Sequence, residues 1–262
     1  LAAASRTLVH SLTSPLVHDL VVGVHCLISL IPGLALRTSG AIPTTPLYDP
    51  LVASLLADVT NVAVSDHAGG LSGEWSVLVG GQSYVLTTRY SYSGEPLAKA
   101  TQYVYEYLQA RDYDVHYHYY PLEGYTLRNV VGEKRGLAYP DQIFVLAAHL
   151  DSRAAVWPHN PAPGADDNAS GSTALLVAAD LLADLDFAYT TRIVFFTGEE
   201  QGPYGSYYYA RDVANAGEDI LGVLNLDMIA WDAEGGPDID LHSHLPSHED
   251  DSDALADLFA AI

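Results

Sequence analysis

Residues 192–202 read RIVFFTGEEQG and join an apolar segment to a pair of adjacent glutamates. Four apolar residues in a row, 193–196, lead through a Thr-Gly pair directly into Glu199 and Glu200. A strand that is apolar throughout, without alternation, is typical of a sheet covered by helices on both faces. In open α/β sheets the carboxyl ends of the strands line a common crevice, where ligands bind. Glu199 and Glu200 are therefore expected at the edge of a ligand site.

From residue 95 onward the chain alternates helix and strand in the same style. Strands are expected at 114–121, 127–134, 143–148, 192–196 and 220–226, and helices at 95–113, 172–184 and 204–213. In the first of these helices Leu97, Thr101, Val104 and Leu108 fall on one face. The pattern predicts an α/β fold, a three-layer α/β/α sandwich around a mixed, mostly parallel central sheet.

Charged or imidazole side chains follow three of the predicted strands, and a slim loop adds two more. They are His149 and Asp151 after 143–148, Glu199 and Glu200 after 192–196, Asp227 after 220–226, and Asp166 and Asp167 in the loop 163–172. Such a like-charge cluster in a partly buried crevice must take up protons or hold cations. Two divalent ions and a bridging hydroxide would balance the three carboxylates of Asp166, Glu200 and Asp227 beside a neutral His149. Histidine with carboxylate ligands suits zinc.

These residues also have ordinary structural interpretations. Adjacent glutamates can begin an exposed helix, aspartates often form turns, and a histidine can be satisfied in a core. Asp227 is the hardest to explain this way, because a carboxylate after an apolar strand would be buried without compensation. The other histidines, including His116 and His118 on one predicted strand, are interpreted as structural.

The composition indicates a folded protein and excludes some partners. Hydrophobic residues make up 49% of the chain and charged residues 17%, which argues for a real core. The formal net charge of -22 argues against nucleic acid and against a stable membrane partner. The single cysteine, Cys26, excludes an internal disulfide framework in this sequence.

Residues 1–45 differ from the rest of the chain. The segment 20–36, LVVGVHCLISLIPGLAL, has the length of a leader's apolar region, and Arg6 precedes it. It is too interrupted for a membrane span. We predict a secretory leader and linker at 1–45, hence a secreted or extracellular protein. An N-terminal anchor and a buried helix are the alternatives.

Four ordered motifs carry a resemblance to a known family. They are AAHLDS at 147–152, PGADDNASGS at 163–172, FFTGEEQG at 195–202 with the trailing GSYYYA at 205–210, and LNLDMIA at 224–230. The sequence resembles the co-catalytic di-zinc aminopeptidases, which include bacterial leucyl aminopeptidases and aminopeptidase Y, with glutamate carboxypeptidases as relatives. The resemblance covers residues 95–262, and the ordered set is far more specific than any one motif.

The resemblance implies two zinc ions and a ligand for each. His149 and Asp227 resemble the ligands of one zinc, Glu200 resembles a ligand of the other, and Asp166 resembles the bridging carboxylate. In the family the peptide bond from that bridging position to the next residue is cis, here expected between Asp166 and Asp167.

The resemblance also implies two residues that act around the metals. Glu199 resembles the general base, which takes a proton from the attacking water and passes it to the leaving amine. Asp151 matches the carboxylate that orients the imidazole of His149.

The family's remaining ligand, a second histidine, comes from a segment well beyond the LDM motif. The sequence stops at Ile262, and we expect it to be cut short at both ends, with a helix at 252–262 that matches a mid-domain helix of the family. One metal is then expected to be held well and the other poorly, with little activity. A histidine of the segment 241–248, LHSHLPSH, is a weaker candidate for the missing ligand.

The sequence therefore predicts an N-terminal appendage at 46–94 and a zinc peptidase domain at 95–262. The expected function is that of an exported zinc exopeptidase, an aminopeptidase acting on peptide substrates. A non-catalytic, receptor-like relative of the same fold is one alternative. A carboxypeptidase or dipeptidase with the same metal centre is the other.

Overall fold

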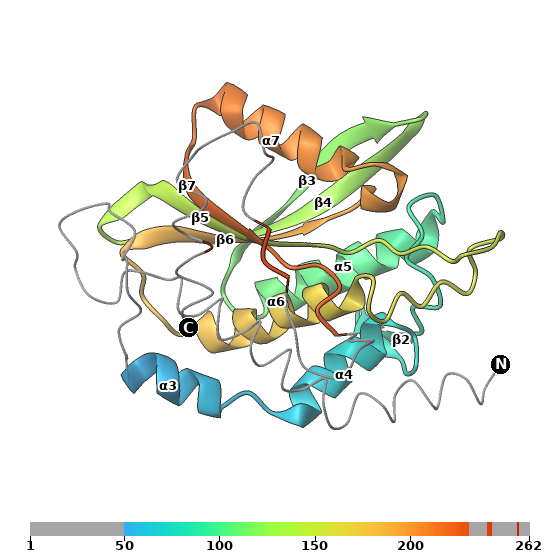
Figure 1. Cartoon of the computed structure of the whole chain (residues 1–262), viewed down its shortest axis with the longest axis horizontal. Coiled ribbons are helices and arrows are strands. Elements are labelled where there is room, and N and C mark those ends of the chain that lie inside the picture. The colour runs from blue at the N-terminus through green and yellow to red at the C-terminus, as the bar shows by residue number, and fades with distance from the viewer. Residues whose placement is uncertain (1–49, 231–239, 243–255, 257–262) are drawn as a thin grey trace.

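The computed structural model describes residues 50–230, 240–242 and 256, and it forms three layers (Figure 1). The elements, in chain order, are α3 (Pro50–Ala57), α4 (Asn61–Leu71), β1 (Val77–Val79), β2 (Gln82–Tyr84), α5 (Glu95–Gln109), β3 (Asp114–Leu122), β4 (Tyr125–Lys134), β5 (Tyr139–His149), α6 (Ala169–Leu182), β6 (Tyr189–Phe196), the 3-10 turn η1 (Glu199–Gln201), α7 (Tyr204–Ala216) and β7 (Asp219–Asn225). The helices and strands predicted between residues 95 and 226 are all present, with ends shifted by a few residues.

The central sheet has the strand order β3-β4-β6-β5-β7. β5 pairs with β6 and with β7 in parallel, whereas β4 pairs with β3 and β6 in antiparallel fashion. Four of the five strands therefore point the same way and only β4 is reversed, which confirms the predicted mixed, mostly parallel sheet. The carboxyl ends of β5, β6 and β7 consequently lie at one edge.

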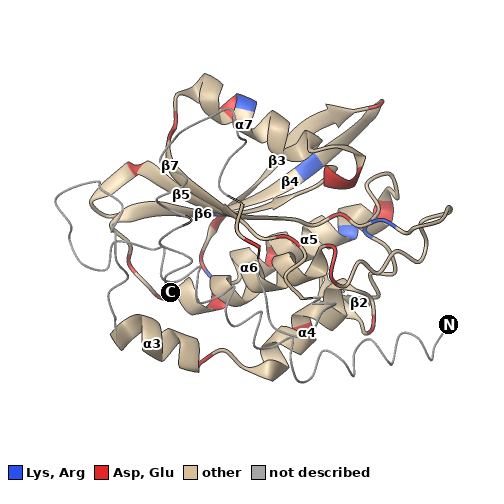
Figure 2. Ribbon diagram, viewed as in Figure 1, with Lys and Arg blue, Asp and Glu red and all other residues tan. Residues whose placement is uncertain are grey.

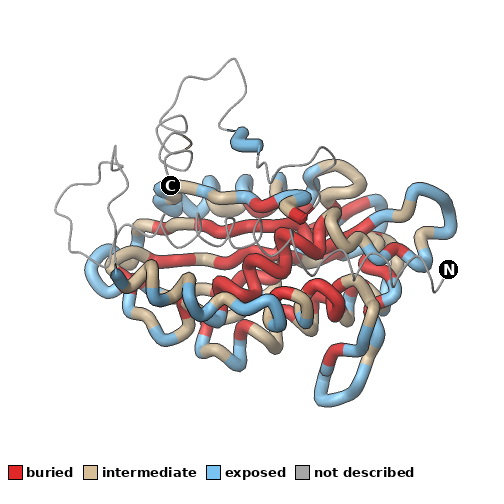
Figure 3. Tube along the Cα trace, turned by 60° about the horizontal axis from the view of Figure 1, so that its bottom comes forward, coloured by how far each residue is buried: buried red, intermediate tan, exposed pale blue. Residues whose placement is uncertain are grey.

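Helices cover the two faces of this sheet. α7 lies on one face, and α5 and α6 lie on the other, with α4 behind α6 (Figure 1). The sequence ASGSTALLVAADLL of α6 is apolar nearly all round, and almost every residue in it is buried, as a helix between a sheet and a second helix requires. Figure 3 shows the buried part of the trace concentrated in the middle of the molecule.

The beginning of α6 packs directly on the end of β7. A Cβ at Gly171 would lie 2.4 Å from the carbonyl oxygen of Leu226, so only glycine permits this approach. The contact brings the loop before α6 next to the end of β7, and it therefore sets where the side chains of that loop meet Asp227.

The segment before α5 shares its core with the rest of the fold. Val64 and Leu71 of α4 and Leu86 belong to the same buried cluster as the leucines of α6. Part of the segment 46–94, predicted as an appendage, thus packs against the sheet-forming part. The domain boundaries themselves stay a prediction.

The acidic composition is visible on the fold. Carboxylate positions occur on most elements, and lysines and arginines are few (Figure 2). Within the described part of the chain no helix is long and apolar enough to cross a membrane. The predicted leader at 1–45, Cys26 and the predicted helix at 252–262 lie outside the described residues, apart from residue 256.

Candidate metal centre

Three side chains from separate segments meet at the shared edge of β5 and β7. Nε2 of His149, the last residue of β5, lies 3.1 Å from Oδ1 of Asp167 and 3.5 Å from Oδ1 of Asp227. The ligand atoms of these three residues all lie within 4.8 Å of one another. One nitrogen and two carboxylate oxygens at this spacing form a possible site for a divalent metal ion.

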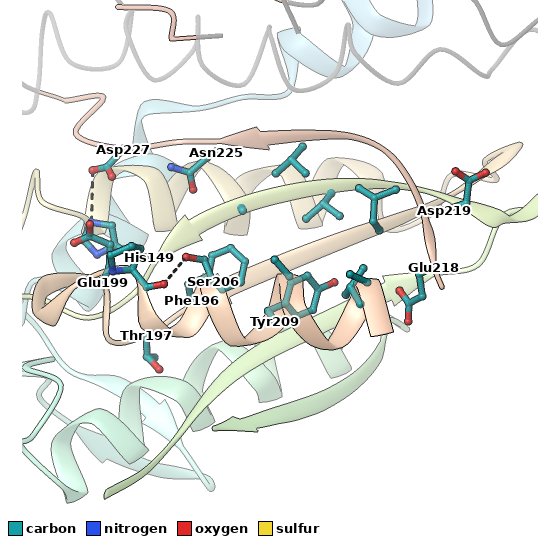
Figure 4. Close-up of a pocket in the computed structure, with 18 residues that line it drawn as sticks. His149, Phe196, Thr197, Glu199, Ser206, Tyr209, Glu218, Asp219, Asn225 and Asp227 are labelled. Atoms are coloured by element: carbon teal, nitrogen blue, oxygen red, sulfur yellow. Dashed lines mark hydrogen bonds and ion pairs between the residues drawn. The ribbon is translucent and has the colours of Figure 1, made fainter. Parts of the chain in front are cut away.

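The site is open to solvent through a cavity. A cavity of about 670 Å³ runs between α7 and the sheet, and its lining includes His149, Glu199 and Asp227. Figure 4 shows these three side chains close together at one end of the cavity. The imidazole of His149 is buried, whereas the side chains of Asp167 and Asp227 are 46% and 42% exposed. A ligand can therefore reach the carboxylates directly.

The orientation of His149 leaves Nε2 for the two carboxylates. Its Nδ1 lies 3.1 Å from the main-chain oxygen of Asp151, to which it donates a hydrogen bond. Burial acts to lower the pKa of His149, but hydrogen bonds with Asp151, Asp167 and Asp227 outweigh it and raise the pKa to about 12. A positive charge between Nε2 and the two carboxylates, either a proton or a metal ion, is therefore favourable.

Asp151 connects the end of β5 to the two glutamates. Its buried carboxylate accepts hydrogen bonds from the hydroxyl of Ser91 at 2.5 Å, from the main-chain N–H of Glu199 at 3.2 Å and from that of Glu200 at 3.3 Å. These two N–H groups begin η1, where a negative charge is favourable. Asp151 thus orients His149 through its carbonyl and fixes both glutamates through its carboxylate.

A second set of contacts holds the segment that leads into η1. The main-chain N–H of Thr197 donates to Oδ1 of Asn129 on β4 at 2.9 Å, and Tyr120 donates its hydroxyl proton to the carbonyl oxygen of Thr197 at 2.5 Å. Asn129 in turn donates to the carbonyl of Gly205 in α7 at 2.9 Å. The end of β6 is therefore tied to β3, β4 and α7 just before the glutamates.

Burial makes both glutamates weaker acids than usual. Burial raises the pKa of Glu199, with the negative charges of nearby aspartates adding to it against the opposite effect of His149. Burial, with the negative charges of Asp167 and Asp151, raises the pKa of Glu200 to about 7. Glu200 therefore stands within the electrostatic reach of Asp167, and Glu199 faces the cavity beside His149.

The structure places Asp167, and not the predicted Asp166, beside His149. Oδ1 of Asp166 accepts a hydrogen bond from the main-chain N–H of Ala230 at 3.0 Å, and the carboxylate next to His149 belongs to Asp167. The cis peptide bond likewise lies between Asp167 and Asn168, one residue later than expected. The other predicted residues, His149, Asp151, Glu199, Glu200 and Asp227, come together around the strand ends.

Asn168 explains why the carboxylate beside His149 comes from Asp167, one residue later than predicted. This residue is the N-cap of α6: its Oδ1 accepts from the N–H of Gly171 at 2.9 Å, and its Nδ2 donates to the carbonyl of Leu226 at 2.9 Å. α6 therefore begins at Ala169, three residues before the predicted start, and Asp167 is the residue that reaches the end of β7. The preference of asparagine for the N-cap was the available signal.

His118, predicted to be structural, is held by protein partners. Nε2 of His118 pairs with Oδ2 of Asp212 at 3.0 Å, and its Nδ1 lies 3.1 Å from Nδ2 of Asn129. Both ring nitrogens therefore have protein partners on the α7 side of the sheet. In the segment 241–248 only Leu241 and His242 are described, so its proposed ligand role stays a prediction.

Comparison with known proteins identifies the family. The model of the family "Peptidase family M28" matches residues 129–261, just over half of the chain. The chain belongs to peptidase family M28.

Two curated fungal proteins are similar to part of this M28 chain. A "Probable zinc metalloprotease" of Pyrenophora tritici-repentis is 35% identical over 106 residues, which is 40% of this chain and 22% of that protein. A "Probable leucine aminopeptidase" of Trichophyton verrucosum is 34% identical over 97 residues, 35% of this chain and 27% of that protein. The matched part thus spans about a quarter of the length of these relatives.

Solved structures support the fold of the M28 chain. The LapA aminopeptidase of Legionella pneumophila is 15% identical with a TM-score of 0.57, over 74% of this chain and 49% of that structure. A glutaminyl cyclase of Macrostomum lignano is 20% identical with a TM-score of 0.56, over 73% of this chain and 60% of that structure. At these identities the likeness shows the shared fold alone.

One contact at the site comes from a residue that precedes the region 129–261 matched by the family model. Ser91 reaches Asp151 from a segment 60 positions earlier in the chain. An isolated serine in a Tyr-rich stretch carries no signal of this contact.

Glu200→Gln is expected to stabilise the metal-free protein at pH 8 by about 1–2 kcal/mol, after allowance for the partial exposure of the side chain. The pKa of about 7 exceeds the ordinary 4.5, so the folded state keeps a proton that the unfolded state has lost. The stability that Glu200 contributes by keeping its proton is therefore lost as the pH rises from 4.5 to about 7. Urea unfolding in the presence of a chelator at pH 5 and pH 8 measures it.

At pH 5 the free energies of unfolding of wild type and Glu200→Gln should differ little, because Glu200 of the folded wild type is then protonated and, like glutamine, uncharged. Asp186→Asn, at an exposed position between α6 and β6 and outside the cluster, is the control and should change neither value. Equal stabilities of wild type and Glu200→Gln at pH 8 would show that burial and the neighbouring carboxylates do not destabilise ionised Glu200.

Proposed function

We propose that the protein carrying this chain is a zinc-dependent exopeptidase, an aminopeptidase that removes N-terminal residues from peptides. The observation that carries the proposal is the position of His149 Nε2, which lies 3.1 and 3.5 Å from the carboxylates of Asp167 and Asp227 with Glu199 lining the same cavity. Membership of family M28 and the names of the fungal relatives support zinc and peptide-bond hydrolysis.

The donor set fits zinc. His149, Asp167 and Asp227 would hold one ion, and Asp167 would bridge to a second ion held by Glu200. Imidazole nitrogen and carboxylate oxygen are ordinary zinc ligands, and the hydrogen bond from Nδ1 to the carbonyl of Asp151 fixes the tautomer that leaves Nε2 free to ligate. When bound, zinc supplies Lewis-acid polarisation of the scissile carbonyl and makes water a better nucleophile at neutral pH.

Glu199 moves the proton in this proposal. Its carboxylate accepts the proton that the attacking water loses as the new C–O bond forms. The same proton then passes to the nitrogen of the leaving amine as the C–N bond breaks. Because burial raises the pKa of Glu199, its carboxylate is a stronger base than that of an ordinary glutamate, which favours the first of these transfers.

The negative charge of the protein favours an aminopeptidase over a carboxypeptidase. Asp151, Asp167, Glu199, Glu200 and Asp227 gather around one edge of the sheet, and the whole chain carries a formal charge of -22. Bound metal ions would offset the ligand carboxylates, but the negative charge of the whole chain remains, and this field attracts the free α-amine of a peptide and repels its C-terminal carboxylate.

The test is hydrolysis of peptides that are blocked at one end. We expect cleavage of peptides and amino-acid anilides with a free α-amine, no cleavage of their N-acetylated forms, loss of activity with a chelator and recovery with zinc. Release of C-terminal residues from N-acetylated peptides would establish the carboxypeptidase alternative instead. Zinc binding without hydrolysis of any of these substrates would establish the receptor-like alternative.

Export is a further part of the proposal. The apolar segment at 20–36 and the acidic composition support it. Recovery of the protein from the culture medium after expression of the complete reading frame is the expected result, and retention inside the cell would contradict it.

One zinc per chain is expected to be held tightly and a second weakly. Three ligands converge on the first site, whereas among the described residues the second has only Glu200 and a share of Asp167. Metal analysis after gel filtration of the zinc-loaded 262-residue chain measures this. A stoichiometry of two after gel filtration would refute the expectation.

A further inference from the structure

The largest fully buried side chain among the described residues is that of Arg89, which has no exposed surface. Arginine is almost never fully buried unless its charge is compensated. Arg89 lies in the loop between β2 and α5, before the region matched by the family model. A buried guanidinium beside a metal site is therefore a feature that requires an explanation.

Four N–H groups of Arg89 donate to main-chain carbonyls. Nε donates to Leu150 at 2.6 Å, and Nη2 donates to Gly164 at 3.0 Å. Nη1 donates to Pro163 at 2.9 Å and also to Leu71 at the end of α4. Leu150 lies between His149 and Asp151, and residues 163 and 164 begin the loop that leads to Asp167. One planar group therefore joins the two segments that carry the nearest pair of metal ligands.

The main chain of Arg89 strengthens the same connection. Its N–H donates to Oγ of Ser152 at 3.1 Å, and its carbonyl accepts from the N–H of Ser152 at 3.3 Å. Ser152 donates its hydroxyl proton to the carbonyl of Ala162 at 2.8 Å. The backbone of Arg89 thus binds Ser152 directly, and Ser152 in turn links this point to Ala162, just before the loop.

The loop is closely packed where it meets the guanidinium. A Cβ at Gly164 would lie 2.3 Å from the carbonyl oxygen of Asp167, 2.6 Å from Cβ of Ser152 and 3.1 Å from Nη2 of Arg89, and Gly164 has a φ of +45°. Only glycine suits this position, which lies against both Ser152 and the side chain of Arg89.

Charge also distinguishes Arg89 from an apolar residue of similar size. The carboxylates of Asp151, Asp167 and Glu200 all act on it, so it offsets part of their repulsion. A guanidinium presents several N–H donors in a rigid plane, which an ammonium group cannot do. The planar set of N–H donors and the positive charge of Arg89 both suit a position between two segments that carry carboxylates.

We propose that Arg89 is a positioning residue for the metal centre, which fixes the distance between His149 and Asp167 by binding the carbonyls of both segments. The inference rests on the proposed function, because it assigns these residues to zinc. Arg89 itself touches neither metal nor substrate in this account.

The test compares Arg89→Met, Arg89→Lys and Arg192→Met with the wild type. Two quantities are measured: the zinc affinity, by competition with a chromogenic chelator, and the amide hydrogen exchange of residues 164–168 in the metal-free protein. We expect Arg89→Met to weaken zinc binding roughly 10- to 100-fold, the range found for residues that support metal ligands. Exchange in the loop should become faster.

Arg192→Met is the matched control. Arg192 is also largely buried and pairs with Glu133 at 2.6 Å and with Glu218, but it touches neither ligand segment. Its loss should destabilise the fold while zinc affinity and exchange at 164–168 stay near those of the wild type. Equal weakening of zinc binding by both variants would overturn the proposal, since it would reflect general destabilisation.

Arg89→Lys covers the case in which the methionine variant does not fold. Lysine keeps the charge but cannot span both segments, so zinc affinity should stay reduced and exchange fast. Wild-type values for Arg89→Lys in both measurements would overturn the proposal. If the wild type binds no zinc, the proposed function fails, whereas the exchange comparison still tests whether Arg89 holds the loop.

Discussion

Replacement of Glu199 by glutamine is expected to lower the turnover number for peptide hydrolysis by about 10²- to 10⁴-fold, the usual contribution of a general base. Glutamine has the same shape but cannot accept the proton that the attacking water must lose. Because Glu199 is held through its main-chain N–H by Asp151, the substitution leaves the position of the residue unchanged. Zinc affinity should therefore stay close to that of the wild type.

The neighbouring glutamate provides the matched control. Glu200→Gln should weaken zinc binding, because Glu200 is placed as a ligand, whereas Glu199→Gln should not. Steady-state kinetics on an unblocked peptide, with a zinc titration of each variant, separates the two roles. A Glu199→Gln variant that keeps more than about a tenth of the wild-type turnover number would exclude Glu199 as the general base.

The fold could be predicted because the hydrophobic pattern within each segment indicates whether that segment forms a helix or a strand. The segments 143–148 and 193–196 are apolar without alternation, and this pattern places β5 and β6 inside a sheet with helices on both faces. β7, at the edge of the sheet, instead alternates in burial along its length. Because β5, β6 and β7 are parallel, their ends bring His149, Glu199, Glu200 and Asp227 to one edge. These residues could be found from the sequence because each lies at the end of a strand or within a few residues after it.

The rest of the site depends on contacts that no local pattern contains. Asp166 and Asp167 are adjacent and identical in type, and the choice between them depends on where α6 begins, which Asn168 decides by capping the helix and by donating to Leu226. Arg89 and Ser91 reach the site from more than 50 positions away in the chain. In the sequence both read as ordinary polar residues of a loop.

Asp167→Asn is expected to weaken zinc binding by at least about 100-fold, which is the upper end of the effect of a residue that only supports a ligand. The carboxylate of Asp167 is the nearest one to Nε2 of His149, at 3.1 Å. An amide removes the charge that the metal ion and the imidazole both face. Since Asp167 would bridge to the ion at Glu200 as well, hydrolysis should fall at least as far as zinc affinity.

Asp166→Asn distinguishes the two adjacent aspartates. Asp166 accepts a hydrogen bond from Ala230, so its amide variant should lose about 1 kcal/mol of stability and keep most of its zinc affinity. A second readout needs no metal. In the chelator-treated protein, Asp167→Asn should lower the pKa of His149, followed by NMR of the imidazole, because a carboxylate that raises this pKa is removed. Asp166→Asn should leave it unchanged. The reverse order of effects, with Asp166→Asn the more damaging to zinc binding and to the pKa of His149, would return the bridging role to Asp166 and contradict the loop register that Asn168 sets.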